Sequence, residues 1–487
     1  DTDPLQAEIL LLLAADDPDE TDWTRVRPVP GKLFLVGDPK QSIYRFRRAD
    51  VGLYESVKRR LIEAGAVLQH LTVSFRAVPE IQAAVNAALA PRMTGSPSQA
   101  SYVPLVPVRA SVPTQPAIVA LPVPQPYGDF GKVVDFRIEE SLPDATAAFI
   151  AWLVRESGWT VAGIGGTRVP IEPRHVCILF RRFRSFETDM THAYVRALEA
   201  RHLPHVLIGG SAFHGREEVE ALRNALTAIE RPDDELAVFA TLRGPFVALS
   251  DAALLAFRER VGGLHPFRRV PDDLAPALGE VAAALGVLRE LHRGRNRRPI
   301  ADTITRFLAA TRAHAGVAIW PTGEQALANV SRLIDLARRA ERNGVMSFRG
   351  FVERLAADAE RGETSDAPIL EEGTGGVRVM TVHRAKGLEF PIVVLADLTA
   401  KEAPGEPSRY TDASRGLCAM RLAGCSPPEL LENREEERER EREEAARILY
   451  VAATRARDRL VVPVIGDERR DGWLSALNPA IYPDHER

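Results

Sequence analysis

The sequence is poor in cysteine and has no long run of apolar residues. Its three cysteines, Cys177, Cys418 and Cys425, are too few for a disulfide framework in a chain of 487 residues, and none has a metal-ligand neighbour at zinc spacing. The longest apolar run, Ile9–Ala15, ends at Asp16 and is too short to cross a bilayer. We therefore expect a cytoplasmic protein that has no membrane partner.

The chain also lacks a large excess of charge of either sign. The formal net charge is −4, which gives no global electrostatic argument for a nucleic-acid partner. Lysine is scarce, with six residues against 57 arginines. Hydrophobic residues make up 45% of the chain and charged residues 27%, which excludes global disorder. At this length we expect about three domains.

Strand-like and helix-like segments follow one another in a pattern that predicts an α/β fold. Lys32–Val36 is a continuous apolar run ending at a Gly-Asp-Pro turn, as in a buried parallel strand. A helix is expected to begin near Pro79, with Ile81, Val85 and Leu89 on one face. Further buried strands are expected at His175–Phe180, Val377–Val382, Ile392–Ala396 and Leu460–Val464.

Four other segments stand out by composition or spacing. Apolar residues between Leu5 and Leu13 recur at helical spacing. Pro91–Pro126 holds nine prolines, so we expect it to be extended or loop-like and to mark an insertion. Residues 233–370 are rich in Ala, Leu and Arg with helical periodicity, which predicts a helical subdomain. Glu435–Glu444 is almost entirely Glu and Arg, and we expect a solvated helix held partly by charge pairs.

Leu35–Arg47 is the first of four segments with chemistry of interest. Its polar stretch Asp38–Ser42 follows a predicted strand, and α/β sheets bind ligands at such strand ends. Gln41 could orient an attacking water or sense a γ-phosphate. Tyr44–Arg47 alternates aromatic residues with arginine, which suits stacking on bases and pairing with phosphates. From the pattern alone, a core aromatic pair with surface arginines is an equally good interpretation.

The other three segments place polar residues beside predicted strands or helices. In Leu71–Arg76 the arginine could act as an arginine finger, although a surface salt bridge is the commoner role of a lone arginine. Val379–Phe390 sets His383, Lys386 and Glu389 in a loop between two strands, with Gly387 permitting a tight turn. In Ile448–Arg457 the spacing puts Tyr450, Thr454 and Arg457 on one helical face, with Arg455 beside them.

In this order, the four segments resemble the later motifs of superfamily 1 DNA helicases of the UvrD/Rep/PcrA class. They are most similar to the RecB and AddA branch, which contains ATP-dependent exonuclease subunits. The specific matches are Gly37–Arg47, His383–Pro391 and Leu449–Arg457, and weaker ones are Gly209–Val219 and Leu242–Phe246.

The resemblance implies an α/β RecA-like P-loop NTPase helicase fold with a helical insertion. Residues 1–68 would be the C-terminal part of the first RecA-like, ATP-binding domain. Residues 69–232, with a Pro-rich insertion at 91–143, and residues 371–487 would form a complete second RecA-like domain. Residues 233–370 would be the α-helical inserted subdomain.

The resemblance also implies that ATP and Mg²⁺ are the cofactors. Gln41 would contact the γ-phosphate, and Arg76 and Arg455 would be arginine fingers, so that these three are the catalytic residues. Asp38 would lie at the nucleotide, Phe75 would stack near the adenine and Glu389 would hold the ribose.

Single-stranded or double-stranded DNA would be the substrate. The residues expected to contact it or to couple it to the nucleotide site are Tyr44, Phe46, Arg47, Thr381 and His383.

The sequence departs from the family pattern at several positions. Arg48 stands where family members usually have glycine, and Ser74 where they often have asparagine. No G-x-x-x-x-G-K-[ST] occurs in the chain, and only Asp1–Pro4 matches the tail of the Mg²⁺-binding motif. We therefore expect a C-terminal part of a helicase, whose main Mg²⁺ ligands lie upstream and which is inactive by itself.

The expected function is that of an ATP-dependent, 3′→5′ DNA helicase or translocase in DNA repair and recombination. The resemblance also allows for a partner subunit in a helicase–nuclease complex. The competing interpretation is a non-hydrolysing DNA-binding or scaffold subunit of such a complex. An unrelated α/β hydrolase is disfavoured because no Ser/His/Asp or paired-carboxylate constellation stands out.

Overall fold

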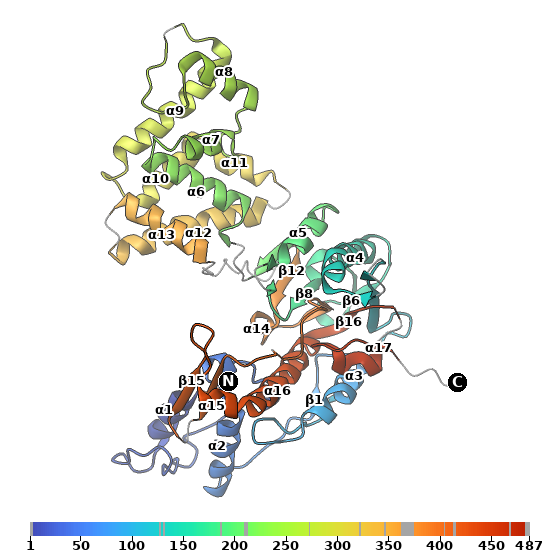
Figure 1. The fold of residues 1–487 in the computed structure, drawn as a ribbon. Helices are drawn as coiled ribbons and strands as arrows, with labels where there is room; N and C mark the ends of the chain where they lie inside the picture. The colour runs from blue at the N-terminus through green and yellow to red at the C-terminus, as the bar shows by residue number, and fades with distance from the viewer. Residues whose placement is uncertain are drawn as a thin grey trace. The chain divides into compact units, whose positions relative to one another are not determined.

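The structure is a computed structural model of the 487-residue chain. It describes residues 3–482 except for 126–127, 130–131, 186–187, 209–212, 272, 321–322, 345–346, 362–374, 404, 413–414 and 467–468. The chain forms two compact units, one from residues 1–203 with 377–487 and one from residues 204–376 (Figure 1). Within the described ranges, no helix is both long enough and apolar enough to cross a membrane.

The first unit is built on a parallel sheet. Five strands of this sheet belong to the unit, in the order β12-β8-β13-β16-β3, and every neighbouring pair is parallel. Their bounds are β3 Ile118–Pro122, β8 Val176–Phe180, β12 Val377–Thr381, β13 Phe390–Leu395 and β16 Ala456–Val464. β8 is buried at every residue, as expected of a strand covered on both faces. Four of the five strands predicted from apolar runs therefore form, with β8 between β12 and β13.

Helices and short strands surround the sheet. The helix α3 packs on α16 and β16, and α4 packs on β3 and α5. The longer helices of this unit are α1 Pro4–Ala14, α2 Val51–Glu63, α3 Pro79–Leu89, α4 Asp135–Arg155, α5 Thr191–Glu199 and α16 Arg434–Ala453. The short helices and helical turns are η1 Pro39–Gln41, η2 Arg45–Arg47, η3 Ala90–Arg92, η4 Ile164–Gly166, η5 Pro173–His175, α14 Val382–Ala385, α15 Pro428–Glu432, η7 Ser475–Leu477 and α17 Asn478–Ile481.

Short two-stranded ladders complete the first unit. They are β1 Val73–Ser74 with β2 Val106–Pro107, β4 Gly128–Asp129 with β5 Lys132–Val133, β6 Thr160–Ala162 with β7 Arg168–Pro170, β9 Arg184–Ser185 with β10 Thr188–Asp189, and β14 Arg409–Asp412 with β15 Leu417–Met420. In α3 the predicted apolar face, Ile81, Val85 and Leu89, is buried.

The prediction of a buried strand at Lys32–Val36 is wrong. These residues are not in a strand, and the side chains of Phe34 and Val36 are 90% and 80% exposed. An apolar run becomes a strand only where neighbouring strands satisfy its backbone groups, and none of the strand pairs in the described ranges includes this run. In α1 the predicted helix forms, but Leu11 is buried while Leu5 and Leu13 are exposed.

The Pro-rich segment Pro91–Pro126, expected to be extended or loop-like, contributes one strand to the sheet. Its residues Ile118–Pro122 form β3, which pairs with β16 at the edge of the sheet. An edge strand tolerates nearby proline because one of its sides makes no ladder hydrogen bonds.

The second unit is helical, apart from the short strand at its start. Its elements are β11 His205–Ile208, α6 Glu217–Glu230, α7 Glu235–Arg243, α8 Asp251–Val261, α9 Pro276–Gly294, α10 Ile300–Ala310, α11 Ala313–Ala318, α12 Gly323–Arg342 and α13 Phe348–Arg361 (Figure 1). Leu222, Val281, Ile304 and Leu333 are among the fully buried residues of its core. The unit begins before residue 233, the expected start of the helical subdomain, because α6 packs on α7 and α13.

Candidate nucleotide and DNA site

The loop after Gly37 is organised by Asp38. One carboxylate oxygen of Asp38 accepts a hydrogen bond from the backbone N–H of Lys40 at 3.1 Å, and the other accepts from Gln41 Nε2 at 2.9 Å. Lys40 Nζ lies 3.0 Å from Asp38 Oδ1 and 5.6 Å from the centre of the Tyr450 ring. Asp38 therefore holds both the lysine and the predicted phosphate-sensing glutamine in one turn, η1.

An aromatic cluster, which we define as Tyr44, Phe46 and His383, joins the following turn, η2, to the short helix α14. The ring centres lie 5.5 to 5.7 Å apart, and the Phe46 and His383 rings meet edge to face. Two cations border the cluster. The Arg47 guanidinium lies 5.5 Å from the Tyr44 ring centre and 5.7 Å from that of Phe46, and Lys386 Nζ lies 5.2 Å from that of Tyr44.

Two hydrogen bonds join the loop carrying Tyr44 to the loop carrying His383. Tyr44 Oη donates to His383 O at 3.0 Å, and His383 Nε2 lies 3.0 Å from Ile43 O. A carbonyl can only accept, so the imidazole donates there. Burial lowers the pKa of His383, which favours the neutral form of its ring. Burial, helped by the charge of Arg455, lowers the pKa of Lys386 to about 8.

The predicted arginine fingers lie next to Glu389. Arg76 Nε donates to Glu389 Oε2 at 2.8 Å, and its Nη1 donates to Thr454 O at 3.4 Å. Arg455 is 1% exposed and donates from Nε to Val451 O at 3.0 Å and from Nη1 to Leu388 O at 2.9 Å. Burial, and then the charge of Arg76, lower the pKa of Arg455 to about 10.

The predicted site residues therefore fall into two groups. Arg76, Glu389 and Arg455 are linked through the segment that ends α16 and the loop before β13. Phe75 precedes this group and is exposed. The aromatic cluster and Arg47 form the other group, and Thr381, the last residue of β12, leads into its His383. Asp38 caps η1 and Gln41 ends it, and η1 packs on α16.

Three residues of this region lie inside the motifs but have no predicted role in the site. They are Lys40, Lys386 and Tyr450, which contact Asp38, Tyr44 and Lys40 respectively. The signal that could have found them is their place inside the matching motifs, between residues already chosen.

The end of α16 differs from the prediction. Arg457 does not share a helical face with Tyr450 and Thr454, because α16 ends at Ala453 and Arg457 is the second residue of β16. The Thr454 hydroxyl donates back to Tyr450 O at 2.6 Å in the last turn of the helix. Arg457 instead donates to Asp458 and to Ala162 O.

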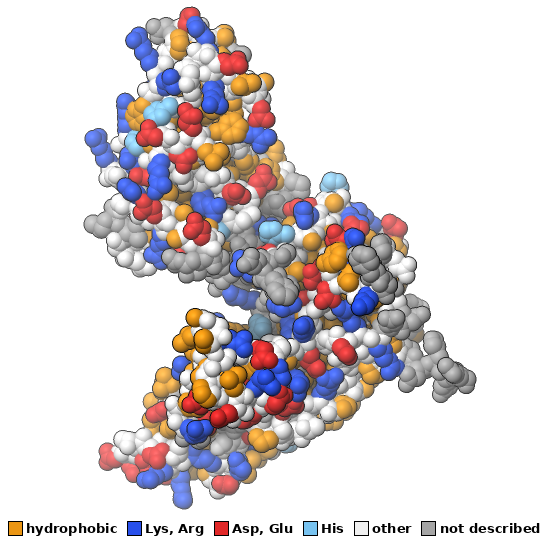
Figure 2. All heavy atoms as spheres, viewed as in Figure 1, with side chains coloured by type: hydrophobic (Ala, Val, Ile, Leu, Met, Phe, Trp, Pro, Cys, Tyr) orange, Lys and Arg blue, Asp and Glu red, His pale blue; other side chains and the backbone are white. Residues whose placement is uncertain are grey.

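The Glu/Arg run Glu435–Glu444 forms part of α16 as a helix, but it is not fully solvated. Glu437 is 1% exposed and Glu443 is also buried, whereas neighbouring residues of the run stay exposed and pair along the helix. Acidic and basic side chains interleave over this part of the surface (Figure 2). Because every position of this run is charged, neither hydrophobic periodicity nor composition indicates which side of the helix is buried.

The donor set fits an anionic phosphate chain, since two guanidiniums and one amide stand in neighbouring loops. For a metal ion, the described residues contain no group of three or more His, Cys, Asp or Glu side chains that could hold one.

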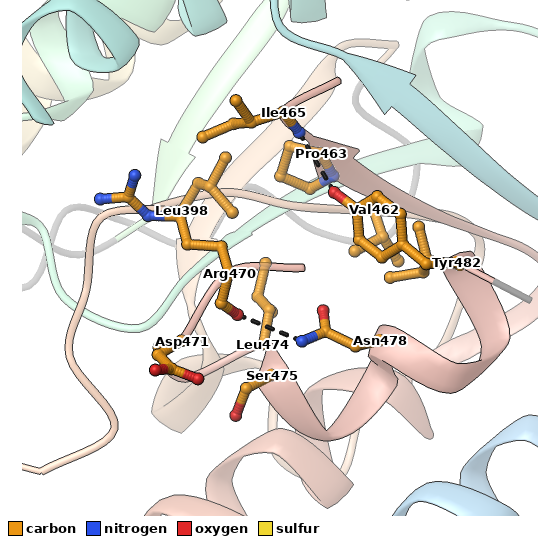
Figure 3. A pocket seen from close by; sticks show the side chains of 12 residues that line it. Leu398, Val462, Pro463, Ile465, Arg470, Asp471, Leu474, Ser475, Asn478 and Tyr482 are labelled. Carbon is orange, nitrogen blue, oxygen red and sulfur yellow. Dashed lines mark hydrogen bonds between the residues drawn. The ribbon is translucent and has the colours of Figure 1, made fainter. Parts of the chain in front are cut away.

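A small pocket lies elsewhere in the first unit, beside α17 (Figure 3). Leu398, Pro463, Leu474 and Tyr482 are among the residues that line it, and Asn478 Nδ2 donates to Arg470 O at 3.2 Å across it. None of the predicted site residues lines this pocket.

Comparison with known proteins gives the same family as the motifs. The UvrD/REP helicase N-terminal domain matches residues 1–61, and the UvrD-like helicase C-terminal domain matches residues 288–466.

Curated relatives are named as the A subunit of an ATP-dependent helicase/nuclease. The protein of Desulforudis audaxviator is 30% identical over 88% of this chain and 37% of its own length. That of Bacillus cytotoxicus is 28% identical over 100% of this chain and 40% of its own, and that of Geobacillus kaustophilus is 28% identical over 94% and 39%. The chain thus spans well under half the length of these relatives.

A UvrD-like helicase domain implies a RecA-like α/β fold, and the parallel sheet flanked by helices agrees with it. The chain is therefore a relative of the UvrD-like helicases, matching both the N-terminal and the C-terminal domain of that family, and of these ATP-dependent helicase/nuclease proteins.

Proposed function

We propose that this chain forms part of the motor of an ATP-dependent DNA helicase or translocase that acts in DNA repair and recombination. The observation that carries the proposal is the aromatic cluster with its two cations, Arg47 and Lys386, joined by one loop to Glu389 and its partner Arg76. One short segment, His383–Glu389, then contributes residues both to the group that contacts DNA and to the group that faces the phosphates of ATP.

On the DNA side, Tyr44 and Phe46 stack on bases of a single strand while Arg47 pairs with a backbone phosphate. Stacking of this kind tolerates any base, because every base has a π-face. Thr381 and His383 lie along the DNA backbone. Phe46 and Arg47 are exposed, so both side chains are accessible to a strand.

On the nucleotide side, ATP supplies the free energy that drives movement. Gln41 contacts the γ-phosphate end, while Arg76 and Arg455 place positive charge where negative charge develops on the transferred group. Phe75 stacks near the adenine, Glu389 holds the ribose and Asp38 orients Gln41. Because Arg455 is bonded to two backbone carbonyls, its guanidinium is held in a fixed orientation.

We further propose that residues 1–68 contribute to a first RecA-like domain and that residues 69–232 and 371–487 form a second one around a helical insertion. Movement is 3′→5′ along one strand, and a partner subunit of a helicase–nuclease complex works with the motor. The names of the relatives, which describe one subunit of a helicase/nuclease, support the partner subunit.

The alternative is a non-hydrolysing DNA-binding or scaffold subunit. It is compatible with the 487 residues, in which no G-x-x-x-x-G-K-[ST] occurs. On either alternative we expect the chain by itself to hydrolyse ATP very slowly. DNA-stimulated hydrolysis of ordinary helicase rate by this chain alone would contradict the roles given to its residues.

The experiment that tests the proposal measures the fluorescence anisotropy of a labelled oligothymidylate titrated with the chain at several salt concentrations. We expect binding that weakens as salt rises, because the phosphates release counterions. We also expect a single strand to compete better than a blunt duplex, because only its bases can stack. Absence of binding at low salt would contradict the proposal.

A further inference from the structure

Side chains of the charged helix α16 bind the loop that carries Tyr44 and Phe46. Arg45, between Tyr44 and Phe46, is held at three points. Its guanidinium lies 2.5 Å from Glu437 Oε1, and its backbone N–H donates to Glu444 Oε1 at 3.1 Å.

The third hold on Arg45 comes from outside the helix. Its carbonyl oxygen accepts from Arg409 Nη2, on β14, at 3.2 Å. Backbone donor, backbone acceptor and side chain of one residue are thus all bonded to residues more than 360 positions away in sequence.

A second anchor from the same helix holds the start of the loop. Arg447 is buried and donates from Nε to Ser42 O at 2.7 Å, and from Nη1 to Ser98 O at 3.0 Å and Gln99 Oε1 at 2.8 Å. The backbone is therefore fixed on both sides of Tyr44, at Ser42 and at Arg45.

Glu437 is an unusual choice for a purely structural contact. It is 1% exposed, so a carboxylate has been taken out of water, and burying a charge is costly unless a partner compensates it. Its hydrogen-bonded partner, Arg45, belongs to the loop, while its other carboxylate oxygen lies 3.6 Å from Arg440 on the helix. The exposed neighbour Glu436 makes its close ion pair, at 2.5 Å, with Arg440 on the helix itself.

We propose that Glu437 and Glu444 are positioning residues for DNA binding, which hold Arg45 so that Tyr44 and Phe46 present their rings to a single strand. The proposal rests on the proposed function, because it assumes that this loop meets DNA. Glu437 itself is too buried to touch DNA and acts through Arg45.

Long-range electrostatics and positioning predict opposite results for one substitution. Glu437→Gln removes a negative charge close to the strand, which by charge alone strengthens binding to a polyanion. If Glu437 positions the loop, the same change weakens binding, because Arg45 loses its fixed partner. The sign of the change in affinity therefore separates the two.

The experiment measures the dissociation constant of a labelled oligothymidylate for the full chain and its variants, with circular dichroism to verify the fold. We expect Glu437→Gln to bind about fivefold to tenfold more weakly, the loss of roughly one charge-assisted hydrogen bond. Glu437→Asp, which keeps the charge, should retain more affinity than Glu437→Gln. The matched control Glu436→Gln should bind like the unmodified chain or slightly more tightly.

A second variant tests whether the contacts that hold Arg45 matter, without changing α16. Arg409→Lys keeps the positive charge but shortens the side chain that donates to Arg45 O, so positioning predicts weaker binding and charge alone predicts no change. This variant also serves if Glu437→Gln fails to fold.

Two outcomes would separate the inference from the proposed function. If Phe46→Ala weakens binding while Glu437→Gln and Arg409→Lys leave it unchanged or tighter, the positioning role is wrong and the DNA-binding loop stands. If Phe46→Ala also leaves binding unchanged, the loop does not bind DNA. The proposed function is then wrong, and the positioning role that depends on it is wrong as well.

Discussion

Arg76 Nε donates to Glu389 Oε2 at 2.8 Å, which joins two residues 313 positions apart in sequence. The pair brings the segment after β1 against the loop before β13, and Arg76 reaches Thr454 O as well. The resemblance assigns Arg76 to the phosphates and Glu389 to the ribose of ATP, and these two residues thus contact each other directly.

Arg76→Ala should change the stability of the fold little. Both partners of its ion pair are partly exposed, at 32% and 47% for the side chains of Arg76 and Glu389, and exposed pairs contribute about 0–1 kcal/mol. We expect a change in the free energy of unfolding below about 1 kcal/mol in urea denaturation. A loss several times larger would mean that Arg76 has a structural role.

Arg455→Ala should behave differently. The guanidinium is buried and bonded to Val451 O and Leu388 O, so its removal leaves a cavity and an unpaired carbonyl. We expect a loss of about 2–4 kcal/mol in the free energy of unfolding, measured by the same denaturation.

The test of Arg455 in hydrolysis therefore needs Arg455→Lys beside Arg455→Ala. In an ATP-hydrolysing protein that contains this chain, the lysine variant should keep the fold and bind DNA nearly normally, yet lose most turnover because it lacks the forked donor. Unchanged turnover in Arg455→Lys would remove Arg455 from the nucleotide site.

Arg48→Gly should stabilise the first unit. Arg48 follows η2 in the left-handed region, with φ of 69°, where a side chain costs free energy and glycine does not. We expect the free energy of unfolding to rise by roughly 0.5–1 kcal/mol. This is a net value, since the greater freedom of glycine in the unfolded chain offsets part of the relieved strain. Thermal unfolding measures it, and a lower midpoint than that of the unmodified chain would contradict the strain at Arg48.

Asp397 should make stability fall as pH rises. Burial raises its pKa to about 7, opposed by the charge of Arg182, and its Oδ1 has no hydrogen-bond partner among the described residues. A group whose pKa is higher in the folded state than in the unfolded state stabilises fully below its unfolded pKa of about 4 and loses that contribution as pH rises through 7.

The variant Asp397→Asn should remove this dependence. Relative to the variant, the unmodified chain should lose on the order of 2–4 kcal/mol between pH 4 and pH 8. Parallel unfolding curves for the two proteins at four pH values provide the test. A constant difference between them would show that Asp397 titrates normally.

The sequence predicted the elements that are strongly periodic or uniformly apolar. β8 and α3 follow from five consecutive apolar residues and from Ile81, Val85 and Leu89 at helical spacing. Phe34 shows the limit of this reasoning, because an apolar run becomes a strand only when a neighbouring strand pairs with it. β3 was missed because nearby prolines hid a short edge strand.

The sequence motifs name individual candidate residues for the site, which remain predictions, and they do not indicate the contacts between these residues. The motifs identified Arg76, Glu389 and Arg455, yet nothing in the sequence indicates that the first two pair or that the third is buried. The burial of Glu437 was equally hidden, since its neighbours in the helix have the same composition and face water. These features depend on contacts between residues hundreds of positions apart.

The aromatic cluster is the central element of this account, and ultraviolet cross-linking of oligothymidylate to the chain tests it most directly. Mass spectrometry of the digested complex identifies the residues that touch the bases. We expect cross-links at Tyr44 or Phe46, and their loss in Phe46→Ala together with weaker binding. Cross-links confined to other parts of the chain, with none in residues 42–48 or 381–389, would contradict the account.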